Sequence, residues 1–306
     1  MKITRTVFLL LFFLFFLGMN ISAEDYQNII SINDPEGDDY GPGTYLYPAD
    51  DIFKVSEGLF DIVSFSVKES EELYLFEFEF GTLTDPWAGK YGFSLPFIEL
   101  YIDNQKGGST SLYREGAGVR LDQKHPWNVL IVLCGWWVRA YTPDDRGVEL
   151  DFWETDENPW DIESAEVVVD DKVISLSFDK EVTGDLNGAY LYLLVGGYDP
   201  FGPGYYRGVG SEISRWNFAD LSNRDLRYAP RVIDLILPSN RKQEDVLSDF
   251  SDDYPIIYPV RLGTGGFLQI IRDYSIYILI SLFIIFLLIL LVYIMHKRPL
   301  ISHNNR

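Results

Sequence analysis

The densest group of residues that could do chemistry is an acidic run near the amino terminus. It reads Asp34-Pro35-Glu36-Gly37-Asp38-Asp39 and places four carboxylates within six residues. Carboxylates this close repel one another unless water or a cation neutralises them, and calcium, a hard oxygen-seeking ion, suits such a group. The spacing imitates an EF-hand loop, but Asp39 stands where that loop needs glycine and Tyr45 where it needs glutamate.

The acidic run therefore predicts either a calcium site of another kind or a solvated acidic turn. In the first case we expect Asp34, Asp38 and Asp39 to bind the ion. Further ligands have to come from other loops that the fold brings close, and Asp61 or Asp199 are our candidates. Calcium is then the one cofactor of the protein.

Tryptophan is the second candidate for binding chemistry. Flat aromatic faces bind the apolar surface of sugar rings while neighbouring polar groups bond the hydroxyls. Trp153 and Trp160 flank an acidic loop, and we expect these two, Trp136 and Trp87 to include sugar-binding platforms. Trp136 and Trp137 adjoin in an expected strand, so alternation exposes at most one of them. The alternative is that most of these rings fill the core or plug loops.

Signatures of catalysis are missing from the sequence. It contains no Gly-x-Ser-x-Gly elbow, no His-Glu-x-x-His and no phosphate loop. Acidic pairs such as Asp151 and Glu154 could do glycosidic chemistry, but such pairs arise by chance among 46 acids. Haem is not expected, because it needs axial ligands and only His125, with no methionine, lies outside the terminal segments. We therefore predict a protein that is not an enzyme and holds no haem.

The charge balance excludes one class of partner. Five of the 25 basic residues are terminal, so 20 bases face 46 acids in the rest of the chain. Nucleic acid is not a partner, because phosphate binding needs clustered Lys and Arg. The single cysteine, Cys134, allows no intrachain disulfide and lies in an apolar run, where a buried inert thiol is expected.

Both ends of the chain look like membrane-targeting segments. Residues 1–23 have a basic start, an apolar stretch and a small-residue end, which is typical of a signal peptide. Residues 274–295 carry no charge and as a helix measure about 33 Å, enough to span a bilayer. The basic tail, residues 296–306, is cytoplasmic by the positive-inside rule, so the amino end lies outside. We expect a single-pass protein of the cell membrane.

Between these segments, alternation of apolar and polar residues predicts strands. Tyr74, Phe76, Phe78 and Phe80 share one face, with Glu77 and Glu79 on the other. Similar runs occur at residues 60–67, 97–103, 129–141, 165–169, 173–178, 190–196 and 232–237. Asp170-Asp171-Lys172 predicts a tight hairpin. We expect one antiparallel β-sandwich, immunoglobulin-like or jelly-roll, over residues 24–238, followed by a polar stalk over residues 239–273.

A longer pattern supports the same fold. The acidic run with Tyr40-Gly41-Pro42-Gly43, then Tyr47-Pro48, Phe53 and Phe60-Asp61, resembles the opening of the C-terminal module of glucodextranase. Asp85-Pro86-Trp87, Tyr101-Ile102-Asp103 and Gly196-Gly197-Tyr198-Asp199 are similar to its later pattern. The resemblance implies a β-sandwich related to family 9 carbohydrate-binding modules and DOMON domains, which binds sugars or holds enzymes at the cell surface.

These observations together predict a function. We expect a membrane-anchored extracellular carbohydrate-binding module, stabilised by calcium, whose partner is a polysaccharide or oligosaccharide. Its acidic surface repels anionic polymers, which favours neutral glucan-type glycans. The alternatives are a structural adaptor that docks a cell-envelope or cell-surface protein and, more weakly, a glycosidase.

Overall fold

The computed structural model describes residues 25–147 and 158–263. Residues 25–262 fall within one compact unit. The predicted signal peptide, transmembrane helix and cytoplasmic tail lie outside the described residues. Among the residues that are described, no helix is long and apolar enough to cross a membrane.

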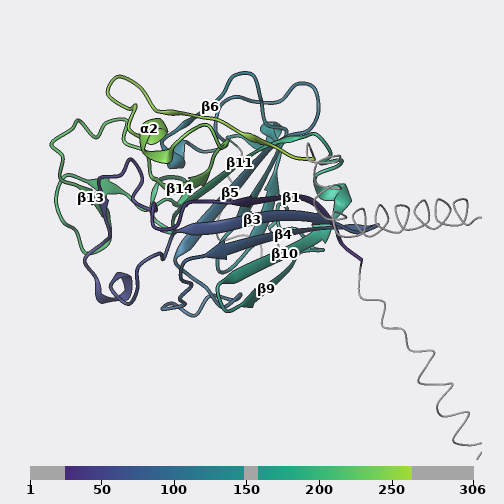
Figure 1. Cartoon of the computed structure of the whole chain (residues 1–306), viewed down its shortest axis with the longest axis horizontal. Helices are drawn as coiled ribbons and strands as arrows, with labels where there is room; N and C mark the ends of the chain where they lie inside the picture. Colours follow the sequence, from purple (N-terminus) through teal and green to yellow (C-terminus); the bar gives the residue numbers. More distant parts are fainter. Residues whose placement is uncertain (1–24, 148–157, 264–306) are drawn as a thin grey trace, which may run out of the picture. The chain divides into compact units, whose positions relative to one another are not determined.

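Two antiparallel β-sheets form the body of this unit (Figure 1). Sheet I has the order β1-β3-β4-β10-β9, with β1 Gln27–Asn33, β3 Ile62–Glu69, β4 Leu73–Phe80, β10 Val173–Asp179 and β9 Glu166–Asp170. Sheet II has the order β14-β11-β5-β7-β8, with β14 Val232–Ile236, β11 Tyr190–Gly197, β5 Pro96–Asp103, β7 Val129–Leu133 and β8 Val138–Tyr141; β16 Val260–Arg261 also pairs with β11. The predicted antiparallel β class is confirmed.

Shorter elements complete the unit. One small sheet combines β2 Tyr45–Leu46, β12 Val209–Gly210 and β13 Phe218–Asp220. Another pairs β6 Arg120–Leu121 with β15 Ile256–Ile257 in parallel, and α2 Gln243–Leu247 is a single short helix. The small sheet with β13 lies at one end of the unit, and both ends of the described chain lie at the other (Figure 1).

Sheet I is buried on one face only, as its alternating sequence predicted. Phe76 and Phe78 are fully buried, whereas Glu77 and Glu79 point outward and accept hydrogen bonds of 2.7 Å from Ser66 and Ser64. The predicted hairpin is confirmed as well, since β9 pairs with β10 across a tight turn. Its Asp171 has φ of +52°, the left-handed conformation that aspartate tolerates in such turns.

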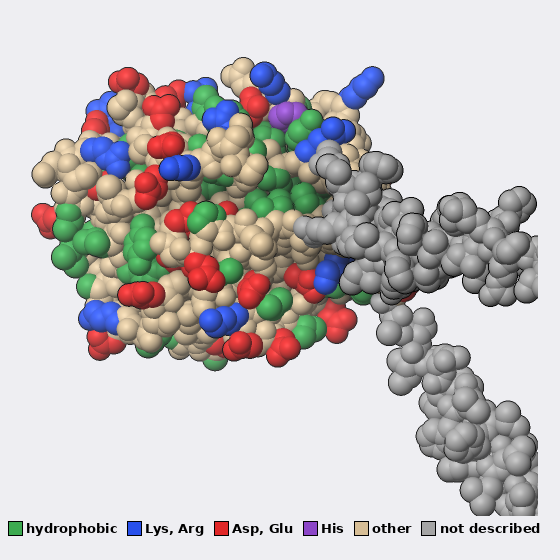
Figure 2. Space-filling view, viewed as in Figure 1, with side chains coloured by type: hydrophobic (Ala, Val, Ile, Leu, Met, Phe, Trp, Pro, Cys, Tyr) green, Lys and Arg blue, Asp and Glu red, His purple; other side chains and the backbone are tan. Residues whose placement is uncertain are grey.

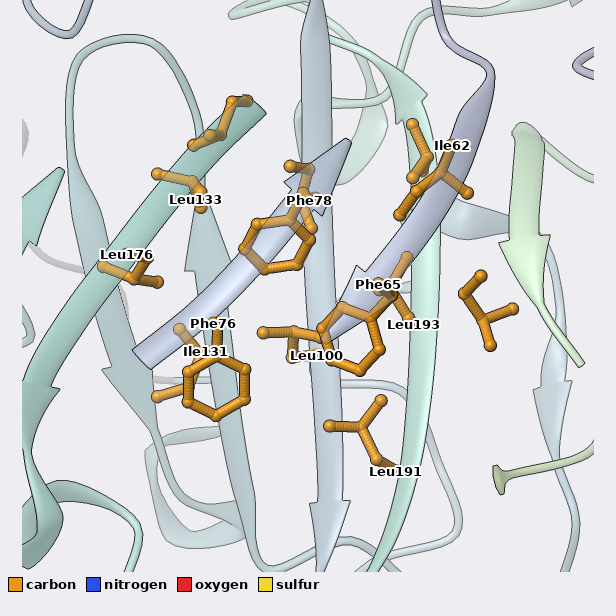
Figure 3. Close-up of a cluster of buried hydrophobic side chains, with 14 of the residues drawn as sticks. Ile62, Phe65, Phe76, Phe78, Leu100, Ile131, Leu133, Leu176, Leu191 and Leu193 are labelled. Carbon is orange, nitrogen blue, oxygen red and sulfur yellow. The ribbon is translucent and has the colours of Figure 1, made fainter. Parts of the chain in front are cut away.

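The main core lies between the two sheets (Figure 3). Sheet I contributes Ile62, Phe65, Phe76, Phe78 and Leu176, and sheet II contributes Leu100, Ile131, Leu133, Leu191 and Leu193. All ten side chains are at most 1% exposed. Burying a side chain of this size stabilises a fold by about 1.5–3 kcal/mol, so this layer is the main source of stability in a domain without a disulfide.

Sheet II is buried on both faces, and a second core covers its outer face. This core includes Tyr101, Trp127 and Tyr192, all at most 1% exposed. The strands of sheet II therefore have continuous apolar sequences instead of alternating ones. Cys134 lies in this second core, where burial raises the pKa of its thiol to about 12. The prediction of a buried thiol is confirmed.

Two sequence predictions need correction here. The run 129–141 is not one strand, because Gly135 to Trp137 form the turn between β7 and β8. Trp136 and Trp137 are therefore not bound by strand alternation, and both are partly exposed. The stalk predicted from residue 239 is wrong as far as residue 262, since this stretch forms α2, β15 and β16 and buries Leu247 and Phe250.

We expect Leu247→Ala to lower the free energy of unfolding by about 2–5 kcal/mol, as large-to-small changes in a core do. The reason is that Leu247 is completely buried in the second core. Chemical denaturation measures the effect, and Asp249→Ala, a change at an exposed neighbour, serves as the control. If Leu247→Ala is as stable as the unchanged chain, the segment contributes nothing to the fold, and the stalk interpretation would be supported instead.

Candidate functional site

A cluster of carboxylates lies where three segments meet. Asp34, Asp38 and Asp39 follow β1, Asp61 directly precedes β3, and Asp234 is the central residue of β14. Oxygen atoms of Asp34, Asp38 and Asp234 lie within 4.8 Å of one another. The charge of Asp61 acts on the pKa of each of the other four carboxyl groups.

Backbone and tyrosine donors hold the buried members in place. Asp234 accepts from Ile62 N at 2.6 Å, and Asp61 accepts from Gly37 N at 2.9 Å. The Oδ2 atom of Asp39 accepts from Phe60 N at 3.2 Å and from the hydroxyl of Tyr47. These bonds cross between segments, so they fix the carboxylates relative to each other.

Four carboxyl groups of the cluster also present an oxygen that has no hydrogen-bond partner among the described residues. Among the described residues, the buried oxygens without a partner include Asp34 Oδ2, Asp38 Oδ1, Asp39 Oδ1 and Asp61 Oδ1. Asp39 and Asp61 are only 1% and 4% exposed. A buried oxygen without a partner is costly, and four in one cluster form the donor set that a hard cation prefers.

The pKa values show how strongly the protein alone disfavours these charges. Burial first, and then the charges of Asp38 and Asp61, raise the pKa of Asp34 to about 8. Burial is also the main reason that the pKa values of Asp38 and Asp39 rise to about 6. The pKa of Asp234 is raised well above its ordinary value by burial and by the charge of Asp34. A divalent cation would reverse these shifts.

The segment 239–262, which the sequence predicted to be a stalk, forms hydrogen bonds to the acidic turn through Gln243. Gln243 of α2 donates to Asp38 O at 2.5 Å and to Ile233 O at 3.1 Å, and it accepts from Leu235 N at 3.0 Å. Gly41 has φ of +56°, and its backbone N–H donates a hydrogen bond to Ile233 O at 2.9 Å. A side chain at Gly41 would meet the ring of Tyr45. The turn is thereby attached to β14 beside Asp234.

The structure thus brings together four of the five predicted metal ligands. Asp199 is not among them, since it accepts from Phe201 N within its own loop and its charge acts on Arg207. Asp234 is the fifth carboxylate of the cluster, and sequence reasoning missed it. Its signal was a single aspartate inside the apolar run Val232–Ile236, where a strand buried on both faces should contain none.

The second candidate site is a band of aromatic rings over the outer face of sheet II, which we call the aromatic strip. Its members are Trp136, Tyr198, Tyr205, Trp137, Arg114, Tyr113, Tyr141 and Trp160. Centroid distances of 5.0 Å for Trp136–Tyr198, 4.2 Å for Tyr113–Tyr141 and 5.2 Å for Tyr141–Trp160 connect the rings. The Arg114 guanidinium lies 4.9 Å from the centre of the Tyr205 ring.

Only two of the four tryptophans predicted to bind sugar lie in the aromatic strip. Trp136 and Trp160 belong to the aromatic strip and are partly exposed. Trp87 packs against Phe53 and the guanidinium of the buried Arg207, away from the strip. Trp153 lies outside the described residues. Trp216, which the prediction omitted, is 41% exposed.

A β-sandwich with a carboxylate cluster at its edge and an aromatic strip over one sheet has the features of a binding module. The chain belongs to the family of C-terminal, SLH-like binding modules of glucodextranase, whose model matches residues 29–258. That family is a binding module and not a catalytic domain. None of the curated proteins matches the chain significantly. The matched range reaches beyond the predicted end of the sandwich at residue 238 and includes α2 and β15.

Proposed function

We propose that this protein is an extracytoplasmic, calcium-stabilised module that binds neutral glucan-type glycans. The aromatic strip is the observation that carries the proposal. Trp136, Trp137 and Trp160 are partly exposed there, and Arg114 and Arg139 lie beside the rings. Aromatic faces supply apolar contact for sugar rings, and guanidinium groups donate to hydroxyls.

Calcium has a structural role in this proposal. Asp34, Asp38, Asp39, Asp61 and Asp234 would hold it, because they carry the oxygens without partners and the carboxylates with raised pKa values. The bound ion neutralises the cluster and links the acidic turn to β3 and β14. A cleft of 420 Å³, lined in part by Asp39, Asp61 and Tyr40, connects the cluster to solvent.

The membrane location rests on the sequence. Residues 274–295 are the proposed single transmembrane helix, with residues 1–23 removed on export and the amino end outside. The excess of acidic residues favours a neutral glycan over an anionic one, since like charges repel.

We expect soluble glucans to shift the tryptophan fluorescence of the protein and Trp136→Ala to weaken their binding about tenfold or more, a loss of about 1.4 kcal/mol. Isothermal titration measures the affinity. Trp216→Ala is the matched control, because Trp216 is exposed at a place outside the strip. Unchanged fluorescence and no measurable heat with any glucan would contradict the proposed function.

A protein-docking adaptor is the second candidate, because the domain exposes several large apolar side chains. Phe201, Ile213 and Val55 are 96%, 64% and 63% exposed. Figure 2 shows hydrophobic side chains gathered at the end that carries β13. Exposed apolar patches of this kind mark interaction sites. An absent response to glucans would favour this candidate.

A further inference from the structure

A pocket lies over the outer face of sheet II. It has a volume of 220 Å³ and lies between the segment from Thr110 to Gln123 and the ring of Tyr254. Its floor is apolar, since Leu112, Val119 and Leu121 are at most 6% exposed. Pockets for drug-sized ligands measure about 300–1,000 Å³, so this one fits a single sugar ring and not a longer chain.

The walls of the pocket are fixed before any ligand arrives. Ile256 and Ile257 of β15 pair with Arg120 and Leu121 of β6, which sets Tyr254 opposite the pocket floor. On the other side, Trp127 Nε1 donates to Ser111 O at 2.8 Å. A preformed pocket of this kind loses little conformational entropy on binding.

Three polar side chains of the pocket have no side-chain partner among the residues that the structure describes. The side chains of Glu115, Gln123 and Arg146 form no hydrogen bond or ion pair with any described residue. The Glu115 carboxylate accepts hydrogen bonds, the Gln123 amide donates and accepts them, and the Arg146 guanidinium donates them. A ring that carries several hydroxyls both donates and accepts, so it matches this mixture.

The charges around the pocket select a neutral ligand. Arg120 is paired with Asp253, so its charge is neutralised within the protein. Glu115 and Arg146 then balance each other, so the pocket has no net charge that would favour an anionic ring over a neutral one. An aromatic wall, an apolar floor and balanced polar groups are together the recognition chemistry of a neutral sugar.

We propose that this pocket binds one neutral monosaccharide unit of the glycan, with Glu115, Gln123 and Arg146 bonding its hydroxyls and Tyr254 against its ring. The inference rests on the proposed function and names the place where it acts. Glu115 directly follows Arg114 of the aromatic strip, so neighbouring units of a bound chain would reach that strip.

The test uses the full-length chain in a detergent whose head group is not a sugar. Titration calorimetry measures binding of glucose, mannose, galactose, xylose and glucuronate, and of soluble dextran. Glu115→Ala and Arg146→Ala remove exposed pocket groups, while Glu181→Ala and Lys124→Ala change exposed charges outside the pocket. We expect at least one neutral monosaccharide to bind and to compete with the glucan. Both pocket variants should weaken binding of this monosaccharide and of dextran tenfold or more. Both control variants should bind them with dissociation constants within twofold of the unchanged chain.

Three results would overturn the inference. If dextran binds but neither pocket variant weakens it, the glycan site lies elsewhere and the proposed function stands. Tighter binding of glucuronate than of every neutral sugar excludes the neutral class. If neither the monosaccharides nor dextran bind, while melting curves show a folded protein, the proposed function fails together with the inference.

Discussion

Calcium at 10 mM is expected to raise the melting temperature of the protein at pH 8 by about 5–10 °C over a chelated sample. Extracellular calcium modules bind with dissociation constants down to about 0.1 mM, and a ligand at 100 times its dissociation constant contributes about 2.7 kcal/mol. In a domain of this size one kcal/mol shifts the melting temperature by about 2–4 °C. The physical reason is that the ion satisfies four buried carboxylate oxygens that the protein leaves without partners.

Variants assign this effect to the cluster. Asp38→Asn and Asp234→Asn each remove a charge from the group of oxygens that lie within 4.8 Å of one another, so both should lose most of the calcium response. Asp252→Asn, a change at an exposed aspartate, should keep it. Differential scanning calorimetry with and without chelator measures the shift. If calcium does not change the melting temperature of the unchanged chain, the cluster binds no calcium, and the acidic run is a solvated turn.

The chelated protein is expected to lose stability as the pH rises from 5 to 8, and the calcium-bound protein is not. Burial raises the pKa of Asp39 from 3.8 to about 6 and that of Asp34 to about 8. Because these folded-state pKa values exceed the unfolded ones, the folded chain binds more protons than the unfolded chain in this window. Its free energy of unfolding therefore falls as these protons leave. For the almost fully buried Asp39 alone the loss between pH 5 and pH 8 is about 1.4 kcal/mol, because only about one pKa unit separates pH 5 from its folded-state pKa of about 6, at about 1.36 kcal/mol per unit.

Calcium changes the sign of this dependence because the ion binds the deprotonated carboxylates, so its contribution grows with pH. Thermal melts at several pH values, with calcium and with chelator, should therefore diverge as the pH rises. Glu99 adds a calcium-independent part, since burial raises its pKa to about 7, and Glu99→Gln removes that part. Parallel pH profiles in the two conditions would contradict a metal at the cluster.

Much of the candidate metal site could be predicted from sequence because its main part is local. Asp34, Asp38 and Asp39 come from one turn, and repulsion between adjacent carboxylates is visible without a fold. Of the two candidates predicted from other loops, Asp61 lies in the cluster and Asp199 does not, and the choice of Asp199 leaves out Asp234. That choice depends on which strand runs beside the acidic turn, and no local pattern encodes it.

The aromatic residues were harder to interpret for a related reason. Tryptophan is equally suited to a core and to a surface, and only the packing decides between them. Trp127 is completely buried, whereas Trp136 became accessible because a turn interrupts the expected strand. The pocket beside Tyr254 could not be foreseen, since its walls are more than 130 residues apart in sequence and meet only through the pairing of β15 with β6.

The sequence by itself determined the β class, the strands of sheet I and most of the strands of sheet II. These features follow from side-chain periodicity, which is a property of neighbouring residues. Only the tertiary structure decided that residues 239–262 belong to the folded unit, that Asp234 completes the carboxylate cluster, and that a pocket forms over sheet II. Each of these depends on contacts between segments distant in the chain, and such contacts are set by how the sheets and loops pack against one another.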